Sequence, residues 1–283
     1  MNAFHPCYLL AHLSTFGRDI SDVRKKIHLS LNHLRSIDPQ AGLLVSGHGP
    51  GLNSLNISGD LCDRLIWDNR NLNSEVGFGH PFTVYRALLI AKSMGYTHIM
   101  KLKFDTCTSV RMLTSVLKHI LEYYSRDIIL TQQSSIERLL AGDLFVFAGI
   151  EEFLQRWNPT TWYPAENGLE AFCRSILNSY GNEVNVETWR SIFASKILHI
   201  NIPSLGIINV DCIGCWHESG LPGRNSDNIL SIPPEFASKF YWGSSEGWHT
   251  FSSNGECVSN PMSYHLSNDI DLRNFAANSR GLI

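Results

Sequence analysis

Short apolar runs alternate with helix-like segments through the first 131 residues, and this alternation limits the fold more than any other feature of the sequence. The apolar runs have the length of buried strands. The segments between them carry an apolar residue every three or four positions, which is typical of amphipathic helices. Repeated strand–helix–strand units predict an α/β fold, with a mostly parallel sheet flanked by helices on both faces. The predicted strands are 6–13, 41–46, 61–67, 97–104 and 128–131, and the predicted helices are 20–37, 81–94 and 110–124.

The pattern changes after residue 134, where the predicted elements become shorter and less regular. From about residue 215 onward Gly, Ser, Asn and Trp dominate. This composition predicts a loop-rich C-terminal portion with short antiparallel strands, including a hairpin over 247–258. We therefore expect a single domain with two halves, 1–133 and 134–283. In the second half the other predicted strands are 143–149, 198–202 and 206–210, and the predicted helices are 150–157 and 165–180.

Composition excludes several classes of protein. Of the 283 residues, 43% are hydrophobic and 17% are charged, a balance that supports a large core and excludes disorder as the main state. The 23 basic and 26 acidic residues give a net charge of −3, whereas a nucleic-acid-binding protein more often carries a basic excess. No apolar run approaches the roughly 20 residues that a membrane-spanning helix needs. We expect a soluble, cytoplasmic protein that binds no nucleic acid.

Seven cysteines are scattered along the chain, and their odd number is typical of reduced thiols rather than of a disulfide framework. Cys212 and Cys215 form a C-x-x-C pair, and Cys257 and His265 would complete a set of four zinc ligands. No second tight pair of ligands is present in the sequence. The favoured interpretation is two small residues packed in or near a strand, and a zinc site stays open as the alternative.

Ligands of parallel α/β sheets bind beyond the carboxyl ends of the strands. The segments at those ends are 11–16, 46–51, 68–71 and 105–108. The second of them reads Ser46-Gly47-His48-Gly49-Pro50-Gly51, and its backbone amides could approach a phosphate. Its glycine spacing matches neither of the common phosphate-binding loops, so a tight turn is the favoured interpretation.

The predicted strand 97–104 carries most of the functional signal, because a carboxylate, Asp105, follows it directly. Lys101 and Lys103 are two residues apart, so both project from one face of this strand. Two cations inside an apolar strand are costly to bury unpaired, and a bound diphosphate would offset that cost. A solvated edge, or ion pairs with acids of a neighbouring strand, explains the two lysines equally well.

Further motifs follow this strand and precede it in a fixed order. They are Trp67-Asp68-Asn69, a helix containing Arg86, Gly95-Tyr96, Lys101-x-Lys103-x-Asp105, the segment 142–149 with Asp143, and Pro164-Ala165-Glu166-Asn167. Their order and spacing resemble the nucleotide-sugar core of GT-A-type glycosyltransferases and, in detail, the WavE-like lipopolysaccharide-synthesis group. The resemblance spans about residues 61–177.

This resemblance implies a GT-A-like, Rossmann-like sheet and the transfer of a sugar from a nucleotide-diphosphate donor. The implied acceptor is a hydroxyl of a polysaccharide or of a lipid-linked glycan, and a lipid-linked acceptor would bring peripheral membrane contact. Residues 1–133 would then bind the nucleotide sugar, and residues 134–283 the acceptor. The implied donor-binding residues are His12, Asp68, Arg86, Lys101, Lys103 and Asp105.

Asp105 matches the family's acid that contacts the ribose and the metal bridging the diphosphate. Asp105-Thr106-Cys107 lacks the second acid of the family's DxD motif. A bound Mn²⁺ or Mg²⁺ at Asp105 is therefore left open, because such ions usually take more than one carboxylate. Positive charge from Lys101, Lys103 or Arg86 is the alternative means of stabilising the leaving diphosphate.

Asp143 and Glu166 are the implied catalytic residues. In an inverting transfer, one carboxylate takes the proton of the acceptor hydroxyl as the new bond forms. Glu166 lies near the start of a predicted helix, where the dipole favours its ionised form, and an ordinary first-turn acid is its simpler explanation. Two other functions stay open: a nucleotidyl- or phosphoryl-processing α/β enzyme, and a non-catalytic carbohydrate-binding protein on a transferase scaffold.

Overall fold

The computed structural model describes residues 3–72, 79–108, 110–131, 145–157, 195–200 and 207–209, together with residues 179, 191, 250–251, 257–258 and 269–270. The chain begins with β1 (Pro6–Ser14), α1 (Ile20–Ile37), β2 (Gly42–His48), α2 (Leu52–Leu55), β3 (Arg64–Asp68) and α4 (Gly79–Ser93). It continues with β4 (His98–Lys103), β5 (Thr106–Thr108), α5 (Leu113–Tyr124), β6 (Ile128–Thr131), β7 (Phe145–Gly149) and α6 (Ile150–Arg156). The later strands are β8 (Ile197–Ile200), β9 (Ile207–Asn209), β10 (Thr250–Phe251), β11 (Cys257–Val258) and β12 (Asp269–Ile270).

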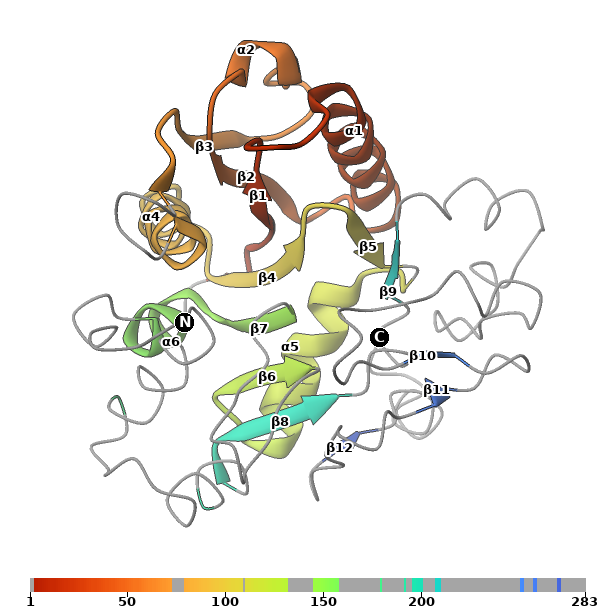
Figure 1. The fold of residues 1–283 in the computed structure, drawn as a ribbon. Helices are drawn as coiled ribbons and strands as arrows, with labels where there is room; N and C mark the ends of the chain where they lie inside the picture. The colour runs from red at the N-terminus through yellow and green to blue at the C-terminus, as the bar shows by residue number, and fades with distance from the viewer. Residues whose placement is uncertain are drawn as a thin grey trace.

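The centre of the molecule is a sheet in the order β12-β8-β6-β7-β4-β1-β2-β3 (Figure 1). Strand β7 is antiparallel to its neighbours β4 and β6, and the other described pairings in this sheet are parallel. The predicted mostly parallel sheet is therefore confirmed. Strands β7, β8 and β12 come from the second half of the sequence and lie in the same sheet as strands of the first half.

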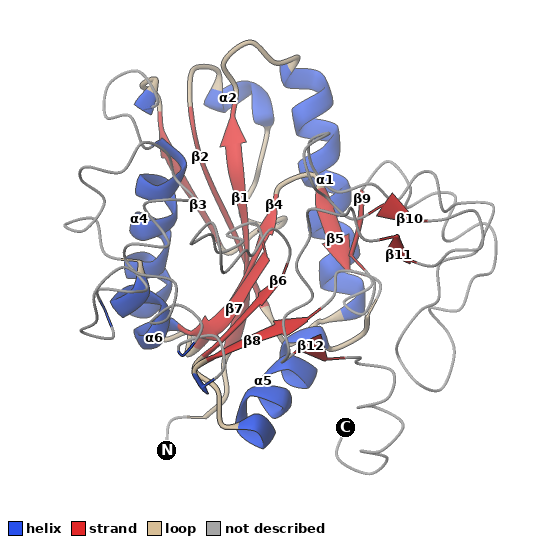
Figure 2. Ribbon diagram, turned by 60° about the horizontal axis from the view of Figure 1, so that its bottom comes forward, coloured by secondary structure: helices blue, strands red, loops and turns tan. Residues whose placement is uncertain are grey.

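Helices cover both faces of this sheet (Figure 2). Along β1, Tyr8 and Leu10 belong to the apolar layer that includes α1 and α5, whereas Leu9 and Ala11 belong to the layer that includes α4. The alternation follows from the period of two in a strand, which sends neighbouring side chains to opposite faces. Both faces are apolar, so the central strands are nearly continuous runs of buried hydrophobic residues, as expected for parallel strands.

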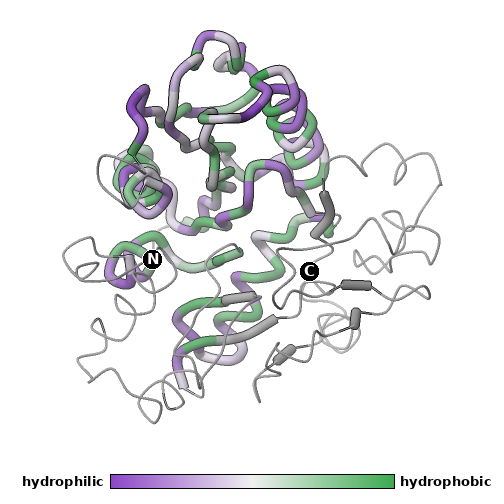
Figure 3. The backbone as a smooth tube through the Cα atoms, in the orientation of Figure 1, coloured by the Kyte–Doolittle hydropathy of each residue, from purple (hydrophilic) through white to green (hydrophobic). Residues whose placement is uncertain are grey.

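Helix α1 has the bounds that the sequence predicts, because its start, its face and its end all carry local signals. Asp19 caps the helix by accepting a hydrogen bond from the Ser21 amide at 2.8 Å. Hydrophilic and hydrophobic residues alternate along the helix (Figure 3), and Val23, Ile27 and Leu31 are buried. Pro39 follows the end of the helix and cannot continue it.

Two further features differ in how well the sequence predicts them. The predicted hairpin over 247–258 is confirmed, since β10 and β11 pair antiparallel. The segment after Asp105 is a strand, β5, that the sequence does not predict, and it pairs antiparallel with β9. Among the described residues, no helix has both the length and the apolar character needed to cross a membrane.

Candidate functional site at the carboxyl edge of the sheet

Three neighbouring strands end in polar residues that lie in one row. Ser14 of β1 is opposite His48 of β2, and His48 is opposite Asp68 of β3. On the other side of β1, Ala11 is opposite Lys103, the last residue of β4. The sheet therefore gathers the predicted segments 11–16, 46–51 and 68–71 at one edge, with the end of β4 beside them. This is the edge at which parallel α/β sheets bind ligands.

Strand β1 is irregular just before this row. Leu10 is opposite Val45 and Leu13 is opposite Gly47, so β1 holds one more residue than β2 over this stretch. His12 lies within the irregular stretch. The structure describes the backbone of His12 and not its side chain, so donor binding by His12 stays a prediction.

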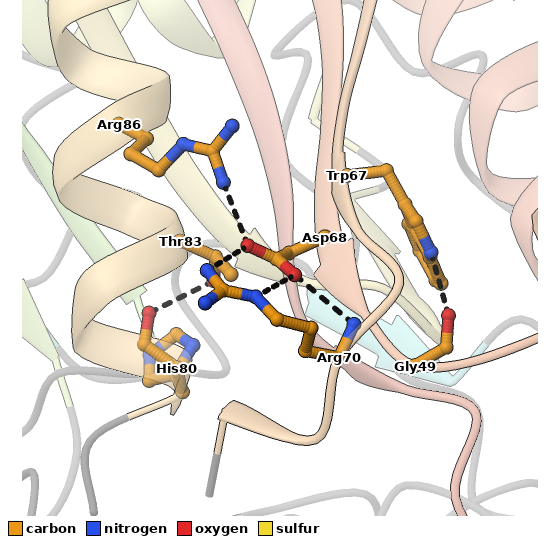
Figure 4. Close-up of polar contacts among 7 residues, drawn as sticks. All are labelled: Gly49, Trp67, Asp68, Arg70, His80, Thr83 and Arg86. Atoms are coloured by element: carbon orange, nitrogen blue, oxygen red, sulfur yellow. Dashed lines mark hydrogen bonds and ion pairs between the residues drawn. The ribbon is translucent and has the colours of Figure 1, made fainter. Parts of the chain in front are cut away.

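The glycine-rich segment after β2 is a tight turn whose backbone groups bind neighbouring protein groups. The Gly49 amide donates to the Asp68 carbonyl oxygen at 2.7 Å, and the Gly49 carbonyl oxygen accepts from Trp67 Nε1 at 2.8 Å (Figure 4). Thr15 Oγ1 donates to the Pro50 carbonyl oxygen at 2.7 Å. Gly49 has φ +117°, and a Cβ there would collide with Thr15 Oγ1. These contacts support the turn interpretation over a phosphate loop.

Asp68 is held by two arginines (Figure 4). Its Oδ1 accepts hydrogen bonds from the Arg70 amide and from Arg70 Nε, both at 3.0 Å. Its Oδ2 accepts from Arg70 Nη2 at 2.9 Å and from Arg86 Nη1, which comes from α4, at 3.3 Å. The hydrogen bonds from the Arg70 side chain are the largest cause of a lowered Asp68 pKa, about 2. The cluster thus has an ionised acid at its centre and a net charge of +1.

Asp105 and Lys103 form an ion pair at the end of β4. Lys103 Nζ lies 3.0 Å from Asp105 Oδ2. The turn that presents them is fixed by two hydrogen bonds, from the Phe104 amide to the Ala11 carbonyl oxygen at 2.9 Å and from Thr106 Oγ1 to the Lys103 carbonyl oxygen at 2.7 Å. Asp105 Oδ1 is buried and makes no hydrogen bond among the described residues. A buried acceptor without a donor is costly, so this oxygen suits a donor group from a ligand.

The two lysines that the sequence places on one face of β4 lie in different surroundings. The Lys101 residue is fully buried, and its Nζ lies 5.4 Å from the centre of the Trp157 ring, a cation–π contact. Trp157 in turn donates from Nε1 to the Pro81 carbonyl oxygen at 2.7 Å. The Lys103 side chain is 37% exposed. Among these two, Lys103 is therefore the lysine that solvent and a ligand reach in this structure.

His48 is a third element of this edge. It is buried between the strand ends, and burial is the largest cause of its lowered pKa. Its Nδ1 has no hydrogen-bond partner among the described residues, and its ring lies 6.5 Å from that of the exposed Phe16. A neutral imidazole beside an ionised carboxylate of the same row, Asp68, gives this edge both a polar and a charged group.

Sequence reasoning missed Arg70, which makes more hydrogen bonds to Asp68 than Arg86 does. The available signal was an acid at a strand end with an arginine two residues later. An aspartate side chain commonly accepts from the backbone two residues on, and this brings the arginine side chain back over the carboxylate.

The described residues do not by themselves form a site for Mn²⁺ or Mg²⁺. Asp105 offers one carboxylate, and its Oδ2 already binds the Lys103 ammonium. The described part of the chain holds no group of three or more His, Cys, Asp or Glu side chains that could bind a metal ion together. Hard cations take several oxygen ligands, so no step is derived through a metal here.

Several predicted residues lie outside the residues that the structure describes. These are Asp143, Glu166, Cys212, Cys215 and His265, with Cys257 described in its backbone alone. Their predicted roles are therefore untested. Asp143 precedes the first residue of β7 by two positions, and β7 pairs with β4 through Val146 opposite Lys101.

Comparisons with known proteins add little to this geometry. No family model matches the sequence, and no curated protein matches it either. Among solved structures, the chain is similar to a Desulfovibrio desulfuricans G20 protein that has been proposed to be a nucleotide-diphospho-sugar transferase. The TM-score is 0.38 at 10% sequence identity, over 70% of this chain and 80% of that chain. A likeness of this size carries no argument about function, which rests on the site itself.

Proposed function

We propose that this protein is a glycosyltransferase, of the GT-A type that its sequence resembles, which moves a sugar from a nucleotide-diphosphate donor to a hydroxyl of a glycan. The observation that carries the proposal is Asp105: a buried carboxylate at the end of β4, with one oxygen on Lys103 and the other without a donor among the described residues. A ribose or sugar hydroxyl would supply that donor. An anion next to the same pair would meet the Lys103 ammonium.

The rest of the edge supports a donor that extends along it. Strand order separates β4 from β3 by three steps, which is about 14 Å at the usual spacing between strands. The Lys103–Asp105 pair lies at one end of this span, and Asp68 with Arg70 and Arg86 lies at the other. We propose that the diphosphate and ribose bind at the first cluster and that Asp68 and its arginines contact the nucleoside. Lys101, which is buried, would act from beneath through its neighbours.

The acceptor half would supply the catalytic base. In an inverting transfer, the acceptor oxygen bonds to the anomeric carbon while the bond from that carbon to the diphosphate oxygen breaks. The hydroxyl proton passes to a carboxylate, and the nucleoside diphosphate leaves. We propose Asp143 or Glu166 for this carboxylate, on the sequence resemblance alone. A polysaccharide or lipid-linked glycan as acceptor, with contact to a membrane surface, belongs to the same proposal.

A panel of UDP-, GDP-, dTDP- and ADP-sugars tests the proposed function. Binding is measured by calorimetry with both Mg²⁺ and Mn²⁺ present, so that a metal requirement does not hide it, and slow hydrolysis is followed as release of nucleoside diphosphate. We expect one nucleotide class to bind and to be hydrolysed slowly without acceptor. The free sugars serve as controls and should not bind.

Three other results would contradict the proposal. Absence of binding and hydrolysis with every donor would remove its basis. Turnover of a nucleoside triphosphate without any sugar would favour a nucleotidyl- or phosphoryl-processing enzyme. Glycan binding without donor binding would favour a carbohydrate-binding protein on a transferase scaffold.

A further inference from the structure

We infer that Lys103 takes the place of a divalent cation at this site, so that the chain binds a nucleoside diphosphate without metal. The inference rests on the proposed function, which supplies the diphosphate. It deepens that function by naming the group that neutralises the phosphate charge.

The geometry of the Lys103–Asp105 pair is the first step. The ammonium lies 3.0 Å from Asp105 Oδ2, and Asp105 is the group that it binds among the described residues. An ammonium has three hydrogen-bond donors, so two remain for a ligand. The Lys103 side chain is 37% exposed while that of Asp105 is 12% exposed. The acid thus holds the base of the pair inside the protein, and the cation faces outward.

The charge of the pair is the second step. A metal ion at Asp105 would have to share the carboxylate with an ammonium already bound to one of its oxygens, and the two cations would repel each other. Asp105 Oδ1 is the remaining carboxylate oxygen, and the described residues bring no second acid next to it. One oxygen is too few for Mg²⁺ or Mn²⁺, which take several. The same oxygen is well suited to accept a hydroxyl of the donor.

The positions of the other cations are the third step. Lys101 is fully buried against Trp157, and Arg86 binds Asp68 at the end of β3, about 14 Å away across the strands. Among the cations that the sequence predicts for donor binding, Lys103 is the one that combines exposure with a place beside Asp105. Charge-assisted hydrogen bonds from its ammonium to two phosphate oxygens would supply the stabilisation that a bridging metal gives elsewhere.

The wild-type protein gives the first test. Binding of UDP, GDP, dTDP and ADP is measured by calorimetry in EDTA and again with Mg²⁺ or Mn²⁺. We expect the nucleotide that binds to show affinities within about twofold under these conditions. Binding that requires the metal and disappears in EDTA would overturn the inference and leave the proposed function intact. Absence of binding under every condition would overturn both.

The variant Lys103→Gln gives the second test. Loss of a charged hydrogen-bond donor should weaken nucleotide binding in EDTA by about tenfold or more. The same change frees both oxygens of Asp105, so Mn²⁺ should now restore part of the affinity. This gain of metal dependence is a readout that a purely structural role for Lys103 would not produce.

A matched control uses Lys92, whose Nζ lies 2.8 Å from Glu151 in an exposed ion pair on α4. Lys92→Gln removes the same charge and should leave both affinity and metal independence unchanged. Thermal unfolding of the two variants shows that each is folded at the temperature of the titration. Equal nucleotide affinity in Lys103→Gln and wild type, in EDTA, would overturn the inference.

Discussion

The two edges of the sheet use aspartate in opposite ways. At the amino edge, Asp63 precedes β3, and its Oδ2 accepts from the Leu43 amide at 2.6 Å and from the Tyr96 hydroxyl at 3.0 Å. At the carboxyl edge, Asp105 follows β4 with one buried oxygen that has no donor among the described residues. Both acids lie beside the end of a parallel strand. One is satisfied by the protein, and the other is left ready for a ligand.

The electrostatics of the two edges differ in the same sense. Near Asp63 the pKa values of neighbouring groups are raised: burial and the Asp63 charge raise that of Tyr96, and burial raises that of Cys62 to about 11. At the carboxyl edge the Arg70 hydrogen bonds lower the pKa of Asp68 to about 2. An excess of negative charge at one edge and of positive charge at the other predicts anion binding at the carboxyl edge.

The largest expected effect comes from Asp105→Asn. The amide keeps the size of the side chain but removes the charge that orients Lys103, and it replaces one acceptor oxygen with a donor. We expect kcat/KM for sugar transfer, or for slow donor hydrolysis, to fall by about 100-fold, which is about 2.7 kcal/mol. Steady-state kinetics with the donor found in the panel measures it.

Asp63→Asn is the matched change at the other edge. It alters an acid that binds only protein groups among the described residues, so kcat/KM per folded molecule should stay near the wild-type value. Equal losses of activity in the two variants would contradict the distinction between the edges.

The second largest effect is on stability and comes from Asp63→Ala. The variant leaves the Leu43 amide and the Tyr96 hydroxyl without their acceptor, and each is buried or partly buried. An unsatisfied buried donor costs about 1–3 kcal/mol, so we expect the free energy of unfolding to fall by about 2 kcal/mol. Urea denaturation of Asp63→Ala and of Tyr96→Phe measures it, and a smaller loss in Tyr96→Phe is expected because one donor goes with its hydroxyl. A stability unchanged in Asp63→Ala would show that solvent replaces these bonds.

The fold was predictable where an element carries its own pattern. Helix α1 has a cap, an apolar face and a proline stop within its own sequence, and its bounds are as predicted. Strand β5 has three residues and pairs with β9, about a hundred residues later, so no local periodicity marks it. The antiparallel direction of β7 is likewise a property of its neighbours and of the chain path, which its own apolar sequence does not encode.

The site was predictable as a place more than as a set of contacts. Parallel strands share a carboxyl edge, so the polar residues that follow β1, β2 and β3 had to meet there, and they do. The spacing of Lys101 and Lys103 predicts a shared face but says nothing of depth. Depth is set by α4 and by Trp157, which cover one lysine and leave the other partly exposed. The roles of Asp143 and Glu166 stay predictions.

The third effect, smaller again, comes from the arginines at the carboxyl edge. Arg70 gives Asp68 three hydrogen bonds and Arg86 gives it one, so Arg70→Gln should weaken donor binding more than Arg86→Gln. We expect about a fivefold loss of affinity for Arg70→Gln, close to 1 kcal/mol, measured by calorimetry. Equal effects of the two changes would show that net charge alone, and not the geometry around Asp68, matters for binding.

Acid titration sharpens the same comparison. The folded-state pKa of Asp68 lies below its ordinary value of 3.8, so its contribution to stability is present above that value and is lost as the pH falls toward about 2. Arg70→Gln removes the largest cause of the shift. The stability difference between wild type and Arg70→Gln should therefore shrink between pH 4 and pH 2, as followed by circular dichroism.

The smallest effect separates two buried histidines, one at each edge. Burial lowers the pKa of His48 at the carboxyl edge and that of His98 at the amino edge below 6.5. The unfolded chain therefore takes up these protons more readily, and stability is full above pH 6.5 and declines as the pH falls below it. His48→Gln and His98→Gln should each reduce this decline, by less than about 1 kcal/mol, because the printed contacts of either ring are few. Nucleotide binding tells the two apart: a ligand at the carboxyl edge excludes water from His48 and disfavours its charged form further, so wild-type affinity should weaken below pH 6.5. His48→Gln should remove that weakening and His98→Gln should retain it, and the opposite pattern in calorimetric titrations would place the ligand away from the carboxyl edge.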